Sequence, residues 1–362
     1  MLFRSGVIGL ACAWRAAQRG LDVCVLDRAM PGAAASRVAA GMLVPVTEVE
    51  FGEESLLELK LASARAYPDF VAELQEASGC EVEYHRDGAL NVALDHDEVE
   101  ELCRLHVLQI ARGLDVEWLT PSACRELEPG LTPSCAGGVF ARDDAHVDPR
   151  TVTAALAAAL GDRVVSGAEV VGAILDGDRI LGVETADGRS FHADRVVLAC
   201  GAWSGVAEWL PEQARPPVRP VKGQILELRG PASAPLCALP VHTERVYVVP
   251  WNGGRVVVGA SVEERGFDTT ITAGAVHELL REAYRALPGI DELELVEVRA
   301  GLRPFTPDKT PLIGPGALEG LILATGHGRH GILLAPVTAE RVAELLTRGT
   351  DFSLSLTAGA RP

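Results

Sequence analysis

Two glycines three residues apart begin the stretch whose residue types most clearly suggest chemistry. The run Ser5-Gly6-Val7-Ile8-Gly9-Leu10 leads into a helix expected over 11–19, and an apolar stretch at 21–26 ends at Asp27. In a βαβ unit such glycines let the backbone approach a pyrophosphate and let the helix pack on the sheet. The helix N-terminus adds free N–H groups and a positive dipole, and a carboxylate after the second strand binds ribose. The stretch indicates a dinucleotide site, for NAD or FAD.

This fingerprint is incomplete at its N-terminal side. Arg4 stands where the first glycine of the G-x-G-x-x-G pattern belongs, and only Met1-Leu2-Phe3 stand where a full strand is expected. We therefore expect a chain truncated in its first strand, through a misplaced start or a fragmentary gene sequence. One alternative is a truncated chain that binds its cofactor weakly and is not an enzyme.

Composition limits the classes of function. The 362 residues are long enough for two domains, and 48% hydrophobic with 23% charged residues indicates a globular chain. A net charge of −17 argues against nucleic-acid binding. No apolar run approaches the roughly 20 residues that span a bilayer, and no signal peptide is visible, so we expect a cytoplasmic protein without a membrane span. The eight cysteines form no C-x-x-C pair, so no metal site is expected.

The order of the expected elements predicts an α/β fold. Helices are expected over 54–75, 97–112, 151–160, 273–286 and 338–346. Asp148 and Pro149 are the predicted N-cap and first residue of the third of these helices. Short apolar runs at 196–200 and 321–325 indicate buried strands of a parallel sheet, and 245–249 with 255–260 indicates a hairpin. We expect one α/β domain assembled from 1–80, 142–215 and 300–350, with a mainly antiparallel domain inserted as 81–141 and 216–299.

Five stretches together resemble the amino-acid-oxidising flavoprotein family that includes D-amino-acid oxidase, sarcosine oxidase and glycine oxidase. They are Gly6–Gly9, Val196–Ser204, Pro220–Gln224, Ala300–Pro304 and Gly326–Pro336. The resemblance covers nearly the whole chain and is closest to the glycine oxidases of thiamine biosynthesis. It implies that the α/β domain is a Rossmann-like FAD-binding domain and that the insert binds substrate.

The resemblance also implies the residues that hold the cofactor. No cysteine stands where sarcosine oxidase attaches its flavin, so we expect non-covalent FAD. The glycine-rich run 326–331 is expected to open a helix whose N–H groups face the electron-rich end of the reduced flavin. The implied FAD-binding residues are Gly6, Val7, Ile8, Gly9, Asp27, Arg28, Ala40, Gly41, Met42, Val170, Gly201, Trp203, Gly326, His327, Gly328, Arg329, His330, Gly331 and Ile332.

Three residues are implied to bind substrate and to act in catalysis: Tyr247, Arg303 and Arg329. An amino-acid substrate brings a carboxylate, which a planar guanidinium binds through two parallel charge-assisted hydrogen bonds. The resemblance assigns that role to Arg303, with the Tyr247 hydroxyl donating to the same carboxylate. Arg329 matches a family position near substrate and flavin.

The implied reaction is oxidative deamination of glycine, sarcosine or D-amino acids by FAD and dioxygen, giving a 2-oxo acid, ammonia and hydrogen peroxide. In this family the flavin takes the α-hydrogen as hydride, so no histidine is needed as a base. A dehydrogenase that passes electrons to a quinone or carrier remains an alternative. A homo-oligomer is also left open.

Three residues leave details of the site open. Arg245 stands where a neutral residue is more typical of glycine oxidases, and Val262 stands where a longer side chain is expected, so the preferred small amine is left open. Lys222 could raise the flavin potential or simply belong to ordinary loop structure.

Overall fold

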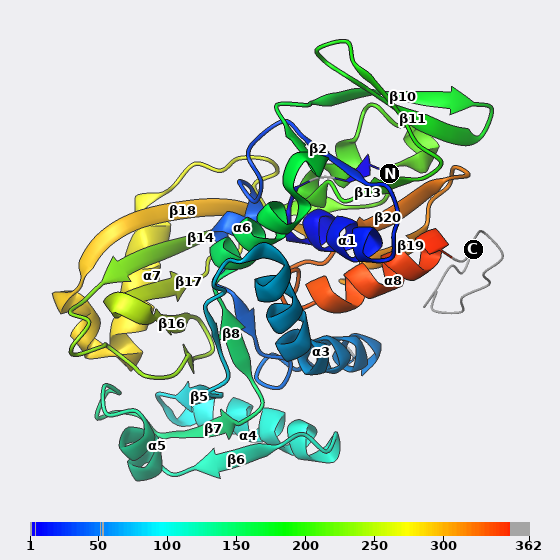
Figure 1. The fold of residues 1–362 in the computed structure, drawn as a ribbon. Coiled ribbons are helices and arrows are strands. Elements are labelled where there is room, and N and C mark those ends of the chain that lie inside the picture. Colours follow the sequence, from blue (N-terminus) through cyan, green and yellow to red (C-terminus); the bar gives the residue numbers. More distant parts are fainter. Residues whose placement is uncertain (1, 4, 51, 53, 348–362) are drawn as a thin grey trace.

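The computed structural model describes residues 2–3, 5–50, 52 and 54–347. Two large sheets dominate this part of the chain, a six-stranded one and an eight-stranded one (Figure 1). Arg4, which interrupts the glycine fingerprint, lies outside the described residues, as do Met1 and positions 348–350 of the expected third segment. None of the described helices combines the length and apolar character that a bilayer crossing requires.

The six-stranded sheet is parallel except at one edge. β19 pairs antiparallel with β20, and all other neighbours are parallel. Its strands run in the order β19 (Leu312–Pro315), β20 (Leu321–Thr325), β13 (Val196–Leu198), β1 (Leu2–Phe3), β2 (Cys24–Asp27) and β9 (Val164–Ser166). The short β1 thus lies inside the sheet, hydrogen-bonded on both sides.

The two faces of this sheet bury different partners because successive strand residues point to opposite sides. Val25 and Val197 face one hydrophobic core, and Leu26 and Leu198 face another. The first core is formed with four helices: α1 (Val7–Gln18), α3 (Glu54–Ser78), α6 (Pro149–Leu160) and α8 (Ala335–Thr347). The second is formed with a small sheet of β10 (Val170–Asp176), β11 (Arg179–Thr185) and β12 (Ser190–His192) and with the segment 207–214, which follows the short 3-10 helix η2 (Gly201–Val206).

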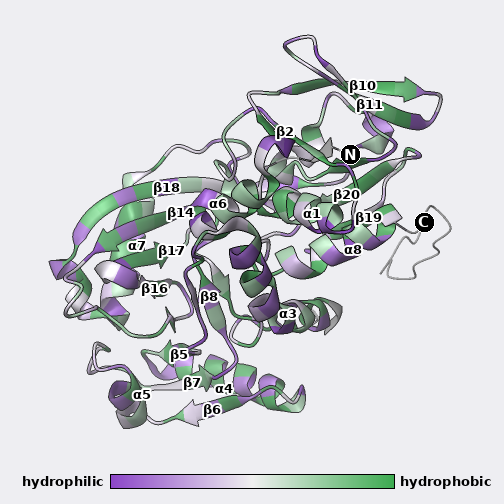
Figure 2. Ribbon diagram, viewed as in Figure 1, coloured by the Kyte–Doolittle hydropathy of each residue, from purple (hydrophilic) through white to green (hydrophobic). Residues whose placement is uncertain are grey.

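Helix α1 is central because almost every side chain along it is apolar (Figure 2). It packs on both α6 and α8, and its Trp14 ring meets the edge of Phe70 from α3 at 5.4 Å between centroids. The helix ends where Gly20 takes a φ of 79°, a left-handed conformation that glycine adopts without strain. This burial fixes the N-terminus of α1 beside the C-terminal end of the central strand β1.

The eight-stranded sheet is mainly antiparallel and lies on the other side of the molecule in Figure 1. Its order is β18 (Glu294–Phe305), β14 (Arg219–Arg229), β17 (Arg255–Gly259), β16 (Tyr247–Trp251), β15 (Val241–His242), β5 (Ala89–Ala93), β7 (Gly137–Ala141) and β6 (Val116–Leu119). Three helices pack on its strands: α4 (His96–Ala111), α5 (Pro121–Leu127) and α7 (Ala273–Ala286).

Buried ion pairs join this sheet to α6. Glu227 of β14 accepts hydrogen bonds from Arg299 of β18 at 2.9 Å and from Arg150 of α6 at 2.5 Å. Arg255 of β17 pairs with Asp148, which caps α6 by accepting from the Arg150 amide at 2.8 Å. A third sheet, β3 (Met42–Leu43), β8 (Ala145–Val147) and β4 (Tyr84–His85), is formed by segments that connect the two parts.

The α/β fold class, the Asp148 cap, both apolar strands and the hairpin predicted from the sequence are confirmed. The helix expected over 338–346 lies within α8, which begins three residues earlier, at Ala335, and turns connect it to the glycine-rich run. Strand β18 continues to Phe305, past position 299 where the insert was expected to end. The domain boundaries stay a prediction.

Candidate active site

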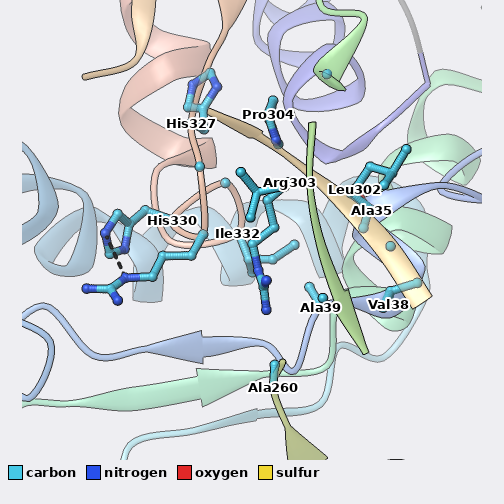
Figure 3. A pocket seen from close by; sticks show the side chains of 18 of the residues that line it. Ala35, Val38, Ala39, Ala260, Leu302, Arg303, Pro304, His327, His330 and Ile332 are labelled. Atoms are coloured by element: carbon cyan, nitrogen blue, oxygen red, sulfur yellow. Dashed lines mark hydrogen bonds between the residues drawn. The ribbon is translucent and has the colours of Figure 1, made fainter. Parts of the chain in front are cut away.

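A cavity of about 1090 Å³ lies between the six-stranded and eight-stranded sheets. One end is bounded by loops that follow β1, β2 and β13, and includes Gly6, Gly41 and Gly201; we call it the glycine end. The other is bounded by β15, β16, β18 and the segment 47–50, and includes Tyr247, Arg303 and Arg329; we call it the arginine end. Figure 3 shows Arg303, Ala260 and Ile332 around this space.

Most of the residues singled out in the sequence line this cavity, and three do not. Gly9 is buried within α1, Gly326 lies outside the lining, and Val170 lines an adjoining cavity of about 410 Å³. That smaller cavity also touches Asp27, Arg28 and Trp203. The residues that line the large cavity are Gly6, Val7, Ile8, Asp27, Arg28, Ala40, Gly41, Met42, Gly201, Trp203, Tyr247, Arg303, His327, Gly328, Arg329, His330, Gly331 and Ile332.

The glycine end is formed largely by backbone. Gly6 is the N-cap of α1 and supplies no side-chain cap, so the first amides of the helix face the cavity region, except that Val7 N donates to Ser36 Oγ at 3.0 Å. Asp27 accepts from the Ser5 amide at 3.0 Å and its hydroxyl at 2.6 Å. Its carboxylate therefore fixes the turn that precedes α1 as well as standing at the cavity wall.

Two side chains at the glycine end, Arg28 and Trp203, pack on each other beside that backbone. The Arg28 guanidinium lies 5.2 Å from the centre of the Trp203 ring, which in turn lies 5.9 Å from Phe267. Arg28 directly follows Asp27, the residue expected from the sequence to bind ribose. A cation over an aromatic face is a favourable arrangement that keeps both planar groups in place.

The arginine end is formed by side chains that cross over glycines of neighbouring strands. A Cβ atom at Gly223 of β14 would lie 2.3 Å from the Arg303 guanidinium, and one at Gly259 of β17 would lie 2.3 Å from the Tyr247 hydroxyl. The Arg303 Nη1 donates to the carbonyl of Ser261 at 2.9 Å. Any residue larger than glycine at these two positions would displace the side chain that lies over it.

Burial raises the pKa of Tyr247 to about 12, and the nearby Arg303 guanidinium only partly opposes this shift. The phenol therefore stays protonated and can donate a hydrogen bond at neutral pH. The pair presents one cation and one neutral donor to the same space. That combination suits an anion.

Arg329 has carboxylate partners of its own. Its Nε lies 3.2 Å from Glu48 Oε2, its Nη2 pairs with Glu50, and its Nε also donates to His330 Nε2 at 3.4 Å, the dashed contact in Figure 3. Burial opposes ionisation of Glu48, but the Arg329 guanidinium, with Lys60, holds its pKa below the usual value. The structure thus places Arg329 in an ion-pair cluster at the cavity wall, and its role toward substrate stays a prediction.

The histidines of the glycine-rich run are uncharged at neutral pH. Burial lowers the pKa of both His327 and His330 to about 3, and His327 Nε2 shares a hydrogen bond with Thr338 Oγ1 at 3.0 Å. The glycine-rich run is also attached to the other sheet, since Gly328 N donates to Pro304 O at 2.8 Å and Phe305 bridges to His327. The last residues of β18 therefore fix the distance between Arg303 and this run.

Lys222 lies outside the cavity lining. Its ammonium is buried between the Thr270 carbonyl and the carboxylates of Glu263 and Asp268, at 3.4 and 3.8 Å from the two acids. Lys222 belongs to strand β14 and not to a loop, and its contacts anchor the segment 261–272 to that strand.

Sequence reasoning missed the side chains and glycines that support Arg303, Tyr247 and Arg329. Gly223 and Gly259 carried a signal, since glycine inside a strand marks close approach of another group. Glu48 and Glu50 carried none, because they meet Arg329 from about 280 residues away in the chain. The described residues hold no cluster of three or more His, Cys, Asp or Glu side chains that could bind a metal ion.

The fold and this cavity define an FAD-dependent oxidoreductase. A family model described as FAD dependent oxidoreductase matches residues 5–345, and the chain belongs to that family. Glycine oxidase from Geobacillus kaustophilus is 34% identical over 361 residues, covering 97% of this chain and 93% of the relative. The crystal structure of glycine oxidase from that organism superposes with a TM-score of 0.89 at 33% identity, covering 98% of this chain and 96% of the other.

A longer relative matches with similar identity. The bifunctional protein ThiO/ThiG of Trichormus variabilis is 34% identical over 351 residues, which is 96% of this chain but 52% of the relative. The chain therefore spans about half the length of that protein. The family resemblance read from the sequence motifs is confirmed.

FAD is the cofactor of this family, and the cavity fits it. A Cβ atom at Gly6, where φ is an ordinary −72°, would meet only Ser36 Oγ, at 3.7 Å, among the residues that the structure describes. Protein packing alone therefore does not require glycine there, and the open space in front of it suits close approach of a phosphate group. Gly41 differs, since a Cβ there would lie 1.9 Å from the Val147 carbonyl.

Proposed function

We propose that this chain is an FAD-dependent amino-acid oxidase that acts on small amino acids such as glycine, sarcosine or D-alanine. The net reaction converts the amino acid, water and dioxygen into a 2-oxo acid, ammonia or an amine, and hydrogen peroxide. The observation that carries the proposal is the pairing of Arg303 with Tyr247 over two glycines, inside a cavity that fits FAD.

The charges around the cavity support an anionic substrate group at Arg303. Six cationic side chains line the cavity, and among the described residues four of them pair with carboxylates: Arg28, Arg219, Lys309 and Arg329. Arg303 donates to the carbonyl oxygens of Ser261 and Lys222, at 2.9 and 3.4 Å, and has no carboxylate partner among the described residues. A substrate carboxylate supplies the missing charge through two parallel hydrogen bonds.

The chain's own residues would bind and orient the substrate. Arg303 and Tyr247 hold the carboxylate, and this fixes the α-carbon relative to the glycine-rich run that β18 contacts. Bound FAD supplies the two-electron acceptor for the α-hydrogen. Positioning of this kind can account for several kcal/mol of the barrier reduction. Gly6, Ile8, Asp27 and Gly41 would hold the cofactor without a covalent bond.

The choice among small amines depends on residues at the cavity edge. Arg245 lines the cavity and is exposed, and Val262 is 76% exposed at the same rim. Neither side chain closes the space around Tyr247. This open space is compatible with N-methylated as well as primary amines. The similarity to glycine oxidases favours glycine and sarcosine.

One experiment tests the proposal directly. Purified protein should carry the yellow absorbance of FAD and release hydrogen peroxide when supplied with glycine, sarcosine or D-alanine. Oxygen consumption measured beside reduction of an artificial dye distinguishes an oxidase from a dehydrogenase that uses a quinone or carrier. A colourless protein that stays inactive after addition of FAD would contradict the proposal.

A role in thiamine biosynthesis follows from the same proposal. The sequence motifs are closest to glycine oxidases of that pathway, and the longer relative is named ThiO/ThiG. Expression of the chain in a bacterium that lacks its own glycine oxidase and requires thiamine should restore growth without thiamine. Growth that still needs thiamine, although active oxidase is present, would contradict the pathway but not the activity.

A further inference from the structure

His242 carries a buried polar atom that the fold leaves without a partner. Its side chain is only 6% exposed, and none of the described residues places a group within hydrogen-bonding distance and geometry of its Nε2. A buried nitrogen in that state costs free energy, roughly 1–3 kcal/mol, unless a ligand or water satisfies it. His242 lines the large cavity, so a bound molecule can reach the ring.

The sheet places this ring beside the anion-binding pair. His242 is directly opposite Tyr247 in the antiparallel pairing of β15 and β16, so both side chains lie on one face of the sheet. Their ring centres are 6.1 Å apart. The imidazole, the phenol and Arg303 therefore surround the same end of the cavity.

The imidazole is neutral at physiological pH. Burial lowers the pKa of His242 to about 4, and although the Glu48 carboxylate favours the charged ring, the Arg329 guanidinium opposes it. A neutral imidazole has one nitrogen that accepts a hydrogen bond. In the tautomer that carries its proton on Nδ1, His242 adds an unpartnered acceptor, Nε2, to the two donor groups of the arginine end.

A small amino acid presents two matching groups, a carboxylate and an amine that donates hydrogen bonds. Arg303 and Tyr247 already provide donors for the carboxylate. Resting on the function proposed above, we propose that Nε2 of His242 accepts a hydrogen bond from the substrate amine and so positions the α-carbon. This makes His242 a substrate-binding residue that distinguishes amino acids from plain carboxylic acids.

A second buried histidine provides a matched control. His146 also has a ring nitrogen without a partner, Nδ1, and burial lowers its pKa to about 3. It stacks on His85 at 4.8 Å and meets Trp251 edge-on, and it does not line the large cavity. Loss of His146 therefore reports the general cost of removing a buried histidine.

The test compares two ligands of nearly the same shape, glycine and propanoate, in which a methyl group replaces the amine. The holoenzyme is prepared as wild type, His242→Leu, His242→Gln and His146→Leu. Glycine is followed by the KM of peroxide formation. Propanoate is followed by the Kd from the change in FAD absorbance, which requires no turnover. The Gln side chain retains an acceptor near the position of Nε2.

We expect His242→Leu to raise the KM for glycine about tenfold or more, while the Kd of propanoate stays within about twofold. His242→Gln should stay within about threefold of wild type for both ligands, and His146→Leu should change neither. Equal losses for glycine and propanoate in His242→Leu would assign the ring to the carboxylate and overturn the inference. An unchanged glycine KM in that variant, or a Gln variant as impaired as the Leu variant, would also overturn it.

Failure of the proposed function gives a different result. A wild-type holoenzyme that oxidises none of glycine, sarcosine and D-alanine contradicts the function, and the inference about His242 fails with it. A wild-type enzyme that is active, with a His242→Leu variant of unchanged glycine KM, contradicts the inference alone.

Discussion

At the glycine end of the cavity, backbone groups come from loops that follow parallel strands, whereas at the arginine end side chains project from the ends of antiparallel strands. Gly6 lets the chain itself lie close to whatever occupies the first region. Gly223 and Gly259 instead let Arg303 and Tyr247 lie close to a neighbouring strand. The same residue type thus serves contact with a ligand at one end and placement of a side chain at the other.

Removal of the Arg303 guanidinium should have the largest effect and should be confined to the arginine end. For Arg303→Leu we expect kcat/KM for glycine to fall about 1000-fold, because a charge-assisted carboxylate contact of roughly 4 kcal/mol is lost. FAD content should remain that of wild type. Steady-state kinetics and the FAD-to-protein absorbance ratio measure the two quantities.

A lysine at the same position separates charge from geometry. Arg303→Lys keeps the cation but not the planar fork, so an intermediate loss of about tenfold to a hundredfold is expected. If Arg303→Leu released FAD as readily as it lost activity, the two ends of the cavity would not be independent.

Addition of one methyl group at Gly223 should disturb Arg303 without touching it chemically. The new Cβ would lie 2.3 Å from the end of that side chain, which can move, so the melting temperature should change little. A displacement of about 1 Å can cost about a hundredfold in rate, and we expect kcat/KM to fall by that order in Gly223→Ala. Gly314→Ala in β19 is the control, because a Cβ there meets nothing within 4 Å. Equal activity in the two variants would contradict the idea that Gly223 makes room for Arg303.

A methyl group at Gly6 should have the opposite pattern. The Gly6→Ala apoprotein should melt like wild type, because the new Cβ meets only Ser36 Oγ at 3.7 Å. FAD should bind about tenfold more weakly, since close approach of the phosphates to the start of α1 is obstructed. Fluorescence titration of apoprotein with FAD gives the Kd. An unchanged Kd would show that the phosphates do not approach Gly6.

The smallest expected effect concerns the segment that leads to Glu48 and Glu50. Asp144 accepts from the amides of Val46 and Thr47 at 3.1 and 2.8 Å. Burial raises its pKa from 3.8 to about 7 despite those amides. The folded protein therefore binds a proton that the unfolded chain releases between those pH values, so this residue lowers the free energy of unfolding as pH rises from about 4 to about 7.

Urea unfolding across that pH range tests this sign. Asp144→Asn should flatten part of the decline, whereas Asp143→Asn, at the exposed neighbouring residue, should leave the slope of wild type. A slope that does not change in Asp144→Asn would contradict the raised pKa of Asp144.

The glycine end was largely predictable from sequence because its residues are close together in the chain and follow recognisable strands. The local spacing of residues in the sequence predicts Gly6, Asp27 and the apolar strand before Gly201. The arginine end was predictable only through family motifs, which named Arg303 and Tyr247 but not what supports them. Pairing of β14 with β18 and the approach of Glu48 to Arg329 depend on contacts between distant segments, which local periodicity does not report. The helix predicted over 338–346 begins three residues earlier, at Ala335, because apolar periodicity does not locate the first turn of a helix sharply.

Strand β18 carries Arg303 and, two residues later, ends on the glycine-rich run through the bridge from Phe305 to His327. The number of residues between Arg303 and Phe305 consequently sets the distance between the Arg303 side chain and the glycine-rich run. Side chains around the cavity can be exchanged one at a time without changing that count. A single-residue insertion or deletion between Gly301 and Phe305 would instead turn Arg303 to the other face of the sheet. Divergence of substrate preference in this architecture should therefore proceed by substitution, with the length of this short segment held constant.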